Sequence, residues 1–286
     1  MPMPPLATDL PPEALRLLAR AREHHTEHEG RRTVWHRWGE GAPLVVLHGG
    51  SGSWTHWLRN IDALAGAGYT LWLPDLPGFG DSDPPAKGQD ADALVAPLAA
   101  GIAQLLGGAG WGLVGFSFGG LTAGLLAATQ PSGLERLVIV GAPALGTGGR
   151  PVKLLEWRHL ARQEEREAVH RHNLAALMLH DPTAITELAV ALHSANLVRD
   201  RMRRRRLSQT DALEQALKQV QVPLAAIYGA QDVLFRHRMG ELEASLRALP
   251  RLAAFELIPD AGHWVQFEAP RELERVLVGV LGQMGG

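Results

Sequence analysis

The chain has 286 residues, 46% of them hydrophobic, so it can bury one large core or a core with an insertion. Its 28 Lys and Arg against 30 Asp and Glu give a formal charge of -2, which excludes a general attraction to nucleic acid or anionic membranes. It has no cysteine, which excludes disulfide scaffolds, thiolate zinc sites and cysteine nucleophiles.

The N-terminal segment MPMPPLATDLPPEALRLLAR has neither the basic nor the apolar region of a secretion signal, and no stretch approaches ~18 uninterrupted apolar residues. We therefore expect a cytoplasmic protein whose partner is a small-molecule substrate, with no nucleic acid and no membrane. The oligomeric state stays open. The following segment EHHTEHE contains His24, His25 and His28. No further ligand follows at metal spacing, so a solvated loop or an edge strand is expected there.

Short apolar runs bounded by glycine and proline then alternate with longer, helix-like stretches. Amphipathic segments lie near residues 57–64, 92–106 and 118–129. The strand candidates are residues 43–48, 69–74, 112–116, 134–141, 223–229 and 252–259. Apolar runs of this kind are typical of parallel strands that helices bury on both faces. The pattern predicts an α/β fold with a mostly parallel, doubly wound sheet.

The alternation stops between about residues 144 and 221, where no strand is predicted and the composition turns to His, Arg, Glu, Leu and Ala at helical spacing. We expect a helical insertion there, and a core domain formed by residues 1–143 and 222–286. The insertion contains the run RDRMRRRRL, from Arg199 to Leu207. It could hold an anionic substrate or nucleic acid, but a solvated helix face balanced by nearby carboxylates is the favoured interpretation.

A serine with a glycine two residues to each side follows directly after the strand predicted at residues 112–116. The sequence Gly115-Phe116-Ser117-Phe118-Gly119 passes directly into the predicted helix. A strand-to-helix turn this sharp forces the serine into a strained backbone conformation and lifts its hydroxyl above the sheet. An idle serine in a tight turn is the alternative. The choice depends on whether the chain supplies a base and an acid.

Both partners follow later strands, in the order that such an elbow requires. Asp232 lies just past the strand at residues 223–229, and His263 lies past the strand at residues 252–259. His237 is the other histidine beyond Asp232, and it falls in or at the start of a predicted helix. Asp260 is expected to be a turn residue, because it is too close to His263 in sequence to reach the far ring nitrogen. Ser117, Asp232 and His263 are therefore the predicted catalytic residues.

Reaction at a carbonyl also needs donors for the oxyanion. One should be the backbone N–H of Phe118, which follows the nucleophile, and the other should come from the loop LVVLHGGSGSW. Gly50 is the first choice there and Ser51 the next. His48 is expected to buttress this loop rather than to act as a second base. The glycine-rich stretch at residues 75–83 lacks the Lys-Ser/Thr of a phosphate loop and is predicted to be a structural turn.

Five segments together, HGGSGSW, PDLPGFGDSD, GFSFGG, YGAQD and GHWVQFEAP, resemble the α/β-hydrolase superfamily from about residue 32 to the end of the chain. The resemblance implies that the insertion is a helical cap over the pocket, and that an acyl-enzyme forms on Ser117. GHWVQFE resembles in particular the enzymes that hydrolyse carbon–carbon bonds in ring-cleavage products. Those enzymes usually carry asparagine at two positions where this chain has Phe116 and His56.

A serine nucleophile argues against the alkyl-carboxylate chemistry of haloalkane dehalogenases and epoxide hydrolases. The sequence predicts a serine hydrolase of carboxylic esters or related acyl bonds, without metal or organic cofactor. Hydrolysis of a carbon–carbon bond in a dienol-keto acid and a slow-turnover ligand receptor on the same fold are the alternatives. An apolar or aromatic substrate is expected if Trp54, Phe116 and Trp264 line the pocket, although each could equally pack in the core.

Overall fold

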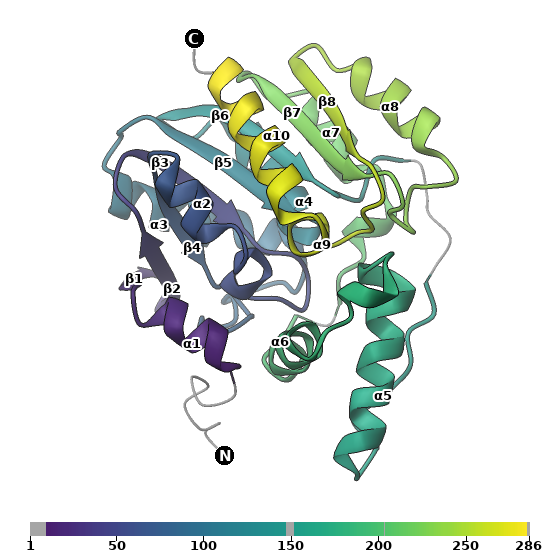
Figure 1. The fold of residues 1–286 in the computed structure, drawn as a ribbon. Coiled ribbons are helices and arrows are strands. Elements are labelled where there is room, and N and C mark those ends of the chain that lie inside the picture. Colours follow the sequence, from purple (N-terminus) through teal and green to yellow (C-terminus); the bar gives the residue numbers. More distant parts are fainter. Residues whose placement is uncertain (1–9, 147–151, 203, 285–286) are drawn as a thin grey trace.

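The computed structural model describes residues 10–146, 152–202 and 204–284. Its centre is an eight-stranded sheet with the strand order β1-β2-β4-β3-β5-β6-β7-β8 (Figure 1). Strands β3 to β8 run parallel, and β2 pairs antiparallel with both β1 and β4. The strands are β1 (Arg22–His28), β2 (Arg31–Trp38), β3 (Ala42–Leu47), β4 (Tyr69–Pro74), β5 (Trp111–Phe116), β6 (Leu134–Val140), β7 (Leu224–Gly229) and β8 (Leu252–Ile258).

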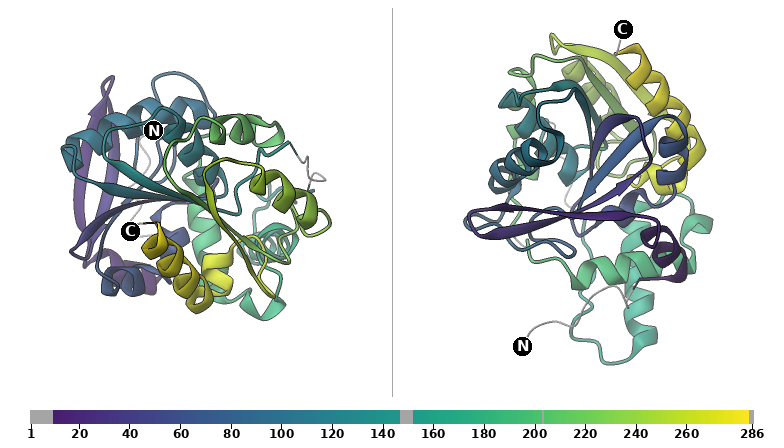
Figure 2. Two further views of the ribbon diagram at one scale, coloured as in Figure 1. Left: turned by 90° about the horizontal axis from the view of Figure 1, so that it is seen from above. Right: turned by 90° about the vertical axis from the view of Figure 1, so that its left-hand side faces the viewer.

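Helices cover both faces of this sheet (Figure 2). One face carries α1 (Pro12–Leu18), α2 (Ile61–Gly66), α9 (Val265–Glu268) and α10 (Pro270–Gln283). The other carries α3 (Val95–Leu106), α4 (Phe118–Ala128), α7 (Ala212–Leu217) and α8 (Met239–Arg247). In β3, Leu44 and Val46 pack into the first layer while Val45 and Leu47 pack into the second. Both faces of the strand are buried, which explains its continuous apolar sequence.

The region between β6 and β7 contains no strand among its described residues, as the composition predicted. Its two long helices, α5 (Gln163–Asn173) and α6 (Glu187–Val198), pack together beyond one end of the strands (Figure 1). Shorter turns complete it, namely η4 (Leu174–Met178), η5 (Pro182–Ala184) and η6 (Leu207–Gln209). The bounds 144–221 of this inserted region and its role as a cap stay predictions. Near its C-terminal end, α7 packs against α4.

The α/β fold predicted from the sequence is confirmed, and all six predicted strands occur within one or two residues of the expected bounds. All but the last residue of the segment EHHTEHE lie in β1, which is an edge strand of the sheet. The hairpin partner β2 was not predicted, because its sequence RRTVWHRW mixes charged residues with the buried ones. Within the described ranges, no helix is long and apolar enough to cross a membrane.

The solvated helix face expected at residues 199–206 is wrong. Helix α6 ends at Val198, and the described residues of the run follow it as irregular chain. Arg199 is 1% exposed, and its guanidinium lies 2.8 Å from Asp81 Oδ2. Arg201 donates to the carbonyls of Phe79 and Gly80. The arginines are thus used to attach this segment to the loop that follows β4.

The sheet topology brings several loops to one edge. From β3 the chain moves to β4 on one side and then returns to β5 on the other, so the carboxyl ends of β3 and β5 lie side by side at a switch point. Open α/β sheets collect their ligands at such a point. The loops after β7 and β8 open at the same edge because those strands are parallel to β5.

Candidate active site

Ser117 joins β5 to α4 in a strained turn, with φ 51° and ψ -119°. Its amide donates to the carbonyl of Val140 at 2.8 Å. A Cβ on Gly119 would lie 2.2 Å from the carbonyl oxygen of His48, and a Cβ on Gly115 would lie 2.3 Å from that of Gly119. Both contacts are too short for any side chain. The two glycines flanking Ser117 are therefore required by the close approach of backbone to backbone.

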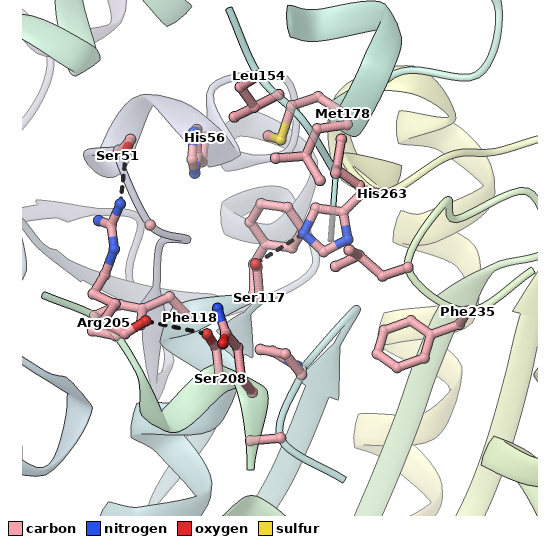
Figure 3. A pocket seen from close by; sticks show the side chains of 18 of the residues that line it. Ser51, His56, Ser117, Phe118, Leu154, Met178, Arg205, Ser208, Phe235 and His263 are labelled. Carbon is pink, nitrogen blue, oxygen red and sulfur yellow. Dashed lines mark hydrogen bonds between the residues drawn. The ribbon is translucent and has the colours of Figure 1, made fainter. Parts of the chain in front are cut away.

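The structure brings Ser117, His263 and Asp232 into one hydrogen-bonded chain (Figure 3). His263 Nε2 lies 2.8 Å from Ser117 Oγ, and His263 Nδ1 lies 2.7 Å from Asp232 Oδ2. Asp232 is fully buried, and its Oδ1 accepts the amide of Leu234 at 2.9 Å. With Nδ1 donating to the carboxylate, Nε2 is the acceptor for the Ser117 hydroxyl, which is the arrangement a general base needs.

His237 and Asp260, the other residues considered for the base and the acid, lie outside this hydrogen-bonded chain. His237 is exposed and sits in a turn before α8, not in the helix that the sequence suggested. Asp260 is exposed in the turn after β8, with φ 55°. Its place in a turn agrees with the prediction.

The predicted oxyanion donors lie next to each other. A Cβ on Gly50 would be 3.5 Å from Phe118 Cβ, and a Cβ on Gly49 would be 3.2 Å from Ser117 Cβ. Phe118 is the first residue of α4, whose N-terminus favours negative charge. Among the described residues, no acceptor is found for the amide N–H of Gly50 or Phe118. Both amides are available to an oxyanion beside Ser117.

Two buried histidines shape the loop after β3. His48 Nδ1 lies 2.7 Å from the carbonyl of Gly49, and His48 Nε2 accepts the amide of Leu76 at 2.9 Å, so His48 buttresses the loop. His56 Nδ1 accepts the amide of Gly49 at 3.2 Å. Burial lowers the pKa of His48 to about 4 and holds the pKa of His56 well below its usual value. Both rings are therefore neutral at pH 7.

A cavity of about 610 Å³ opens above Ser117. Phe116, Phe118 and His263 line it from the core. The remaining side chains come largely from the inserted region and are mostly apolar, including Val152, Leu154, Leu177, Met178 and Leu197. Figure 3 shows Ser51 and Arg205 on one side of Ser117, and Phe235 and Met178 on the other. The cavity thus has a polar side and an apolar side.

Two of the predicted pocket residues lie elsewhere. Trp54 and Trp264 are each 1% exposed and are absent from the cavity lining. Trp54 packs against His36 and Trp38, and Trp264 stacks on Phe267. Large aromatic rings next to a site are often used to pack the core beneath it. Of the three predicted pocket aromatics, Phe116 is the one that reaches the cavity.

The sequence did not single out Arg205, Asp200 or Asn196. Arg205 reaches the cavity, where its guanidinium donates to Asp200 Oδ2 at 2.9 Å and to Ser51 Oγ at 3.0 Å. A Cβ on Gly50 would lie 3.3 Å from its terminal nitrogen. Within a run of arginines in irregular chain, no periodicity marks the one that turns inward. The described residues contain no group of three His, Asp or Glu side chains that could hold a metal ion.

Comparison with known proteins relates this site to a family. Residues 44–276 match the model described as "Alpha/beta hydrolase family". The 2-hydroxy-6-oxononadienedioate/2-hydroxy-6-oxononatrienedioate hydrolase of Paraburkholderia phymatum is 30% identical over 263 residues, which cover 84% of this chain and 87% of the relative. The 2-hydroxy-6-oxo-6-phenylhexa-2,4-dienoate hydrolase of Comamonas testosteroni is 27% identical over 261 residues, covering 86% and 89%. An esterase structure from Rhodococcus aligns with a TM-score of 0.75 at 22% identity, covering 93% of this chain and 100% of the esterase.

Proposed function

The chain belongs to the alpha/beta hydrolase family, and from that premise we propose that it is a serine hydrolase in which Ser117 is the nucleophile, His263 the general base and Asp232 the residue that orients the base. The observation that carries this proposal is the continuous hydrogen-bonded chain from Asp232 through His263 to Ser117. A serine at an unstrained turn, or one without a bonded histidine, would not support it.

The reaction follows from these contacts. His263 takes the Ser117 proton as Oγ attacks a carbonyl carbon, and the amides of Gly50 and Phe118 stabilise the oxyanion. Collapse of the intermediate breaks the bond to the leaving group, which takes its proton from His263. A water molecule, activated by the same ring, then releases the acid from the acyl-enzyme. Asp232 stabilises the imidazolium at each step.

For the substrate, we propose a dienol-keto acid that is cleaved at a carbon–carbon bond. A carbon leaving group must carry an electron pair away. This is feasible once the hydroxyl proton of the dienol has moved to the carbon beside the attacked carbonyl, because the electron pair then spreads onto the keto oxygen that the shift creates, and a cation near that oxygen stabilises it. Arg205 offers that cation beside Gly50, on the polar side of the cavity. Its guanidinium has five N–H donors, so bonds to Asp200 and Ser51 leave others for a ligand. The curated relatives named above act on compounds of this class.

The apolar side of the cavity fits the acyl half of such a substrate. Met178 and Phe235 face this side, and Leu154 lies next to Met178 above Ser117 (Figure 3). Their side chains provide contacts for an alkyl or phenyl group next to the attacked carbonyl. The bond to be cleaved would then lie above Ser117, between the apolar and polar sides.

Hydrolysis of an apolar carboxylic ester is the second candidate. The observation that favours it is Phe116, whose ring lies 5.1 Å from that of His263 and gives the cavity floor an apolar surface. The leaving group of an ester is its alcohol part, whose oxygen takes its proton from His263. No distant cation is needed to spread its charge. Under this alternative Arg205 has no role in binding the substrate.

Labelling tests the assignment of Ser117 as the nucleophile, and turnover measurements test the choice of substrate. A fluorophosphonate should modify Ser117 and no other serine, as read by mass spectrometry of the digest. Turnover of 2-hydroxy-6-oxo-6-phenylhexa-2,4-dienoate should exceed that of 4-nitrophenyl butyrate. The reverse ranking would favour the ester candidate, and labelling at another serine would refute the assignment of Ser117.

A pair of arginine variants tests the polar side. Arg205→Gln should lower kcat/KM for the dienoate by a factor at least about ten times larger than the factor lost with 4-nitrophenyl butyrate. The reason is that only the dienoate carries a carboxylate. Arg162→Gln, which changes an exposed arginine of the inserted region, should leave both values unchanged. Equal losses with both substrates in Arg205→Gln would contradict a role in binding the carboxylate.

A further inference from the structure

The loop from Gly49 to His56, called the oxyanion loop below, is fixed by the core near its two ends. The amide of Gly49 donates to His56 Nδ1 at 3.2 Å, which closes the loop on itself. The amide of Trp54 donates to Asp75 Oδ1 at 3.1 Å, and Asp75 is fully buried. These bonds fix the start of the loop after β3 and the 3-10 turn at its end, η2 (Trp54–Trp57). They do not reach its middle.

Side chains after α6 hold the middle of the loop. Ser51 Oγ donates to Asp200 Oδ2 at 2.6 Å, and Arg205 donates to Ser51 Oγ at 3.0 Å. Ser51 has φ 50°, a conformation that residues other than glycine seldom adopt. Asp200 is itself fixed, since its Oδ1 accepts the amide of Met202 at 2.8 Å. The strained residue next to Gly50 is thus bonded to the inserted region.

Asn196 on α6 adds a second attachment. Its side chain is fully buried, and its Oδ1 accepts a hydrogen bond from Ser53 Oγ at 2.8 Å. Its Nδ2 donates to Thr55 Oγ1 at 3.0 Å. Among the described residues, the side-chain bonds that Ser51 and Ser53 make outside their own loop all go to residues 196–205.

A buried ion pair connects the same two regions below the loop. Arg199 NH2 lies 3.7 Å from Asp75 Oδ2, and both side chains are almost fully buried. Burial opposes ionisation of Asp75, but His36 and Arg199 outweigh it and hold the pKa of Asp75 below its usual range. The carboxylate that accepts the Trp54 amide is therefore compensated by His36 of the core and, in part, by Arg199 of the inserted region. Moving that region away would leave His36 as the remaining close partner of this buried charge.

We propose that Asn196 and Asp200 are positioning residues that hold the oxyanion loop in the shape that aims the Gly50 amide at the reacting carbonyl. On this view the inserted region completes the oxyanion hole when it is seated, besides covering the cavity. The inference rests on the proposed function, because the loop matters only if an oxyanion forms at Ser117. It adds that transition-state stabilisation depends on side chains more than 70 residues distant in sequence from either oxyanion donor.

Asn196→Leu tests this, because leucine keeps the volume and removes the bonds to Ser53 and Thr55 without touching Arg205. With 4-nitrophenyl butyrate, kcat should fall about 10- to 100-fold while KM changes less than about threefold. The affinity for an alkyl trifluoromethyl ketone, whose serine adduct places an oxyanion in the hole, should fall by a similar factor. Thr186→Ala is the matched control, since Thr186 caps the other end of α6 and does not contact the loop. It should lower the melting temperature and leave kcat unchanged.

Ser53→Ala removes the same bond from the loop side and serves as the test if Asn196→Leu does not fold. In a double-mutant cycle the two losses should be strongly non-additive. Wild-type kcat and wild-type trifluoromethyl ketone affinity in the folded variants would overturn the inference, whatever their melting temperatures. Failure of the proposed function gives a different result, namely activity that survives Ser117→Ala.

Discussion

Two serines on neighbouring loops share a left-handed backbone conformation but are held in different ways. Ser117 has φ 51° and Ser51 has φ 50°. Ser117 is fixed by main-chain bonds within the core, because its amide donates to Val140 and its carbonyl accepts the amides of Gly120 and Leu121. Ser51 is fixed through its hydroxyl by residues of the inserted region. The strained turn at Ser117 is thus held by main-chain bonds of the core, whereas the strained turn at Ser51 depends on the inserted region being in place.

The largest expected effect comes from removing the hydroxyl at the rigid position. Ser117→Ala should lower kcat by ~10³-fold or more, because binding and the oxyanion donors alone leave only residual catalysis. The measurement is steady-state hydrolysis of whichever of the dienoate and 4-nitrophenyl butyrate is the better substrate. Ser245→Ala on α8 is the control and should retain wild-type activity. A Ser117→Ala enzyme with near wild-type turnover would contradict the nucleophile assignment.

Backbone packing at the elbow can be broken without touching any functional group. Gly119→Ala should destabilise the protein by about 3 kcal/mol, since its Cβ would lie 2.2 Å from the carbonyl oxygen of His48. Gly279→Ala in α10 is a matched change, because nothing lies within 4 Å of its Cβ position. It should stabilise the helix by about 0.5 to 1 kcal/mol. Urea unfolding of both variants checks the difference in sign, and equal effects would refute the packing argument.

Acid should destabilise the protein through His48, the buried histidine that buttresses the oxyanion loop. The pKa of His48 is lowered by burial to about 4, against an ordinary value of 6.5. The unfolded chain therefore binds a proton on this ring at a pH where the folded chain does not. The resulting stability is complete above pH 6.5 and is lost as the pH falls toward 4, by about 3 kcal/mol.

Unfolding free energies at pH 7 and pH 4.5 measure this loss. In His48→Gln the pH dependence should be flatter than in the wild type, because one buried neutral ring is gone. His237→Gln removes an exposed histidine and should follow the wild-type curve. A His48→Gln protein with the wild-type slope would show that other groups account for the acid sensitivity.

The smallest expected effect is at the position that the inserted region holds. Ser51→Ala should lower kcat about tenfold, because alanine keeps the unfavourable φ and loses both bonds. Ser51→Gly should lower kcat only a few-fold, since glycine adopts this φ without strain. Comparison of kcat for the two variants checks the order. Equal losses in the two variants would indicate that the hydroxyl, and not the backbone conformation, is what matters.

The core and the inserted region also differ in how much of each could be predicted from the sequence. The six strands β3 to β8, the elbow around Ser117 and the loops that carry Asp232 and His263 were located by local pattern and chain order, whereas β2 was not. The arginine run was misjudged, and Arg205 was not distinguished from its neighbours. Trp54 and Trp264 were placed in the pocket but lie in the core. Aromatic and arginine side chains serve either purpose, and the residue type does not say which.

The sequence by itself determined the α/β fold and the order of Ser117, Asp232 and His263, because apolar periodicity and glycine spacing act over a few residues at a time. The tertiary structure alone decided which side chains of the inserted region meet the oxyanion loop. Asn196 contacts Thr55 across 141 positions of the chain, and Asp200 contacts Ser51 across 149. Neither segment carries a local signal for the other, since such contacts arise from how two separately formed regions pack, and each hydrogen bond depends on that packing.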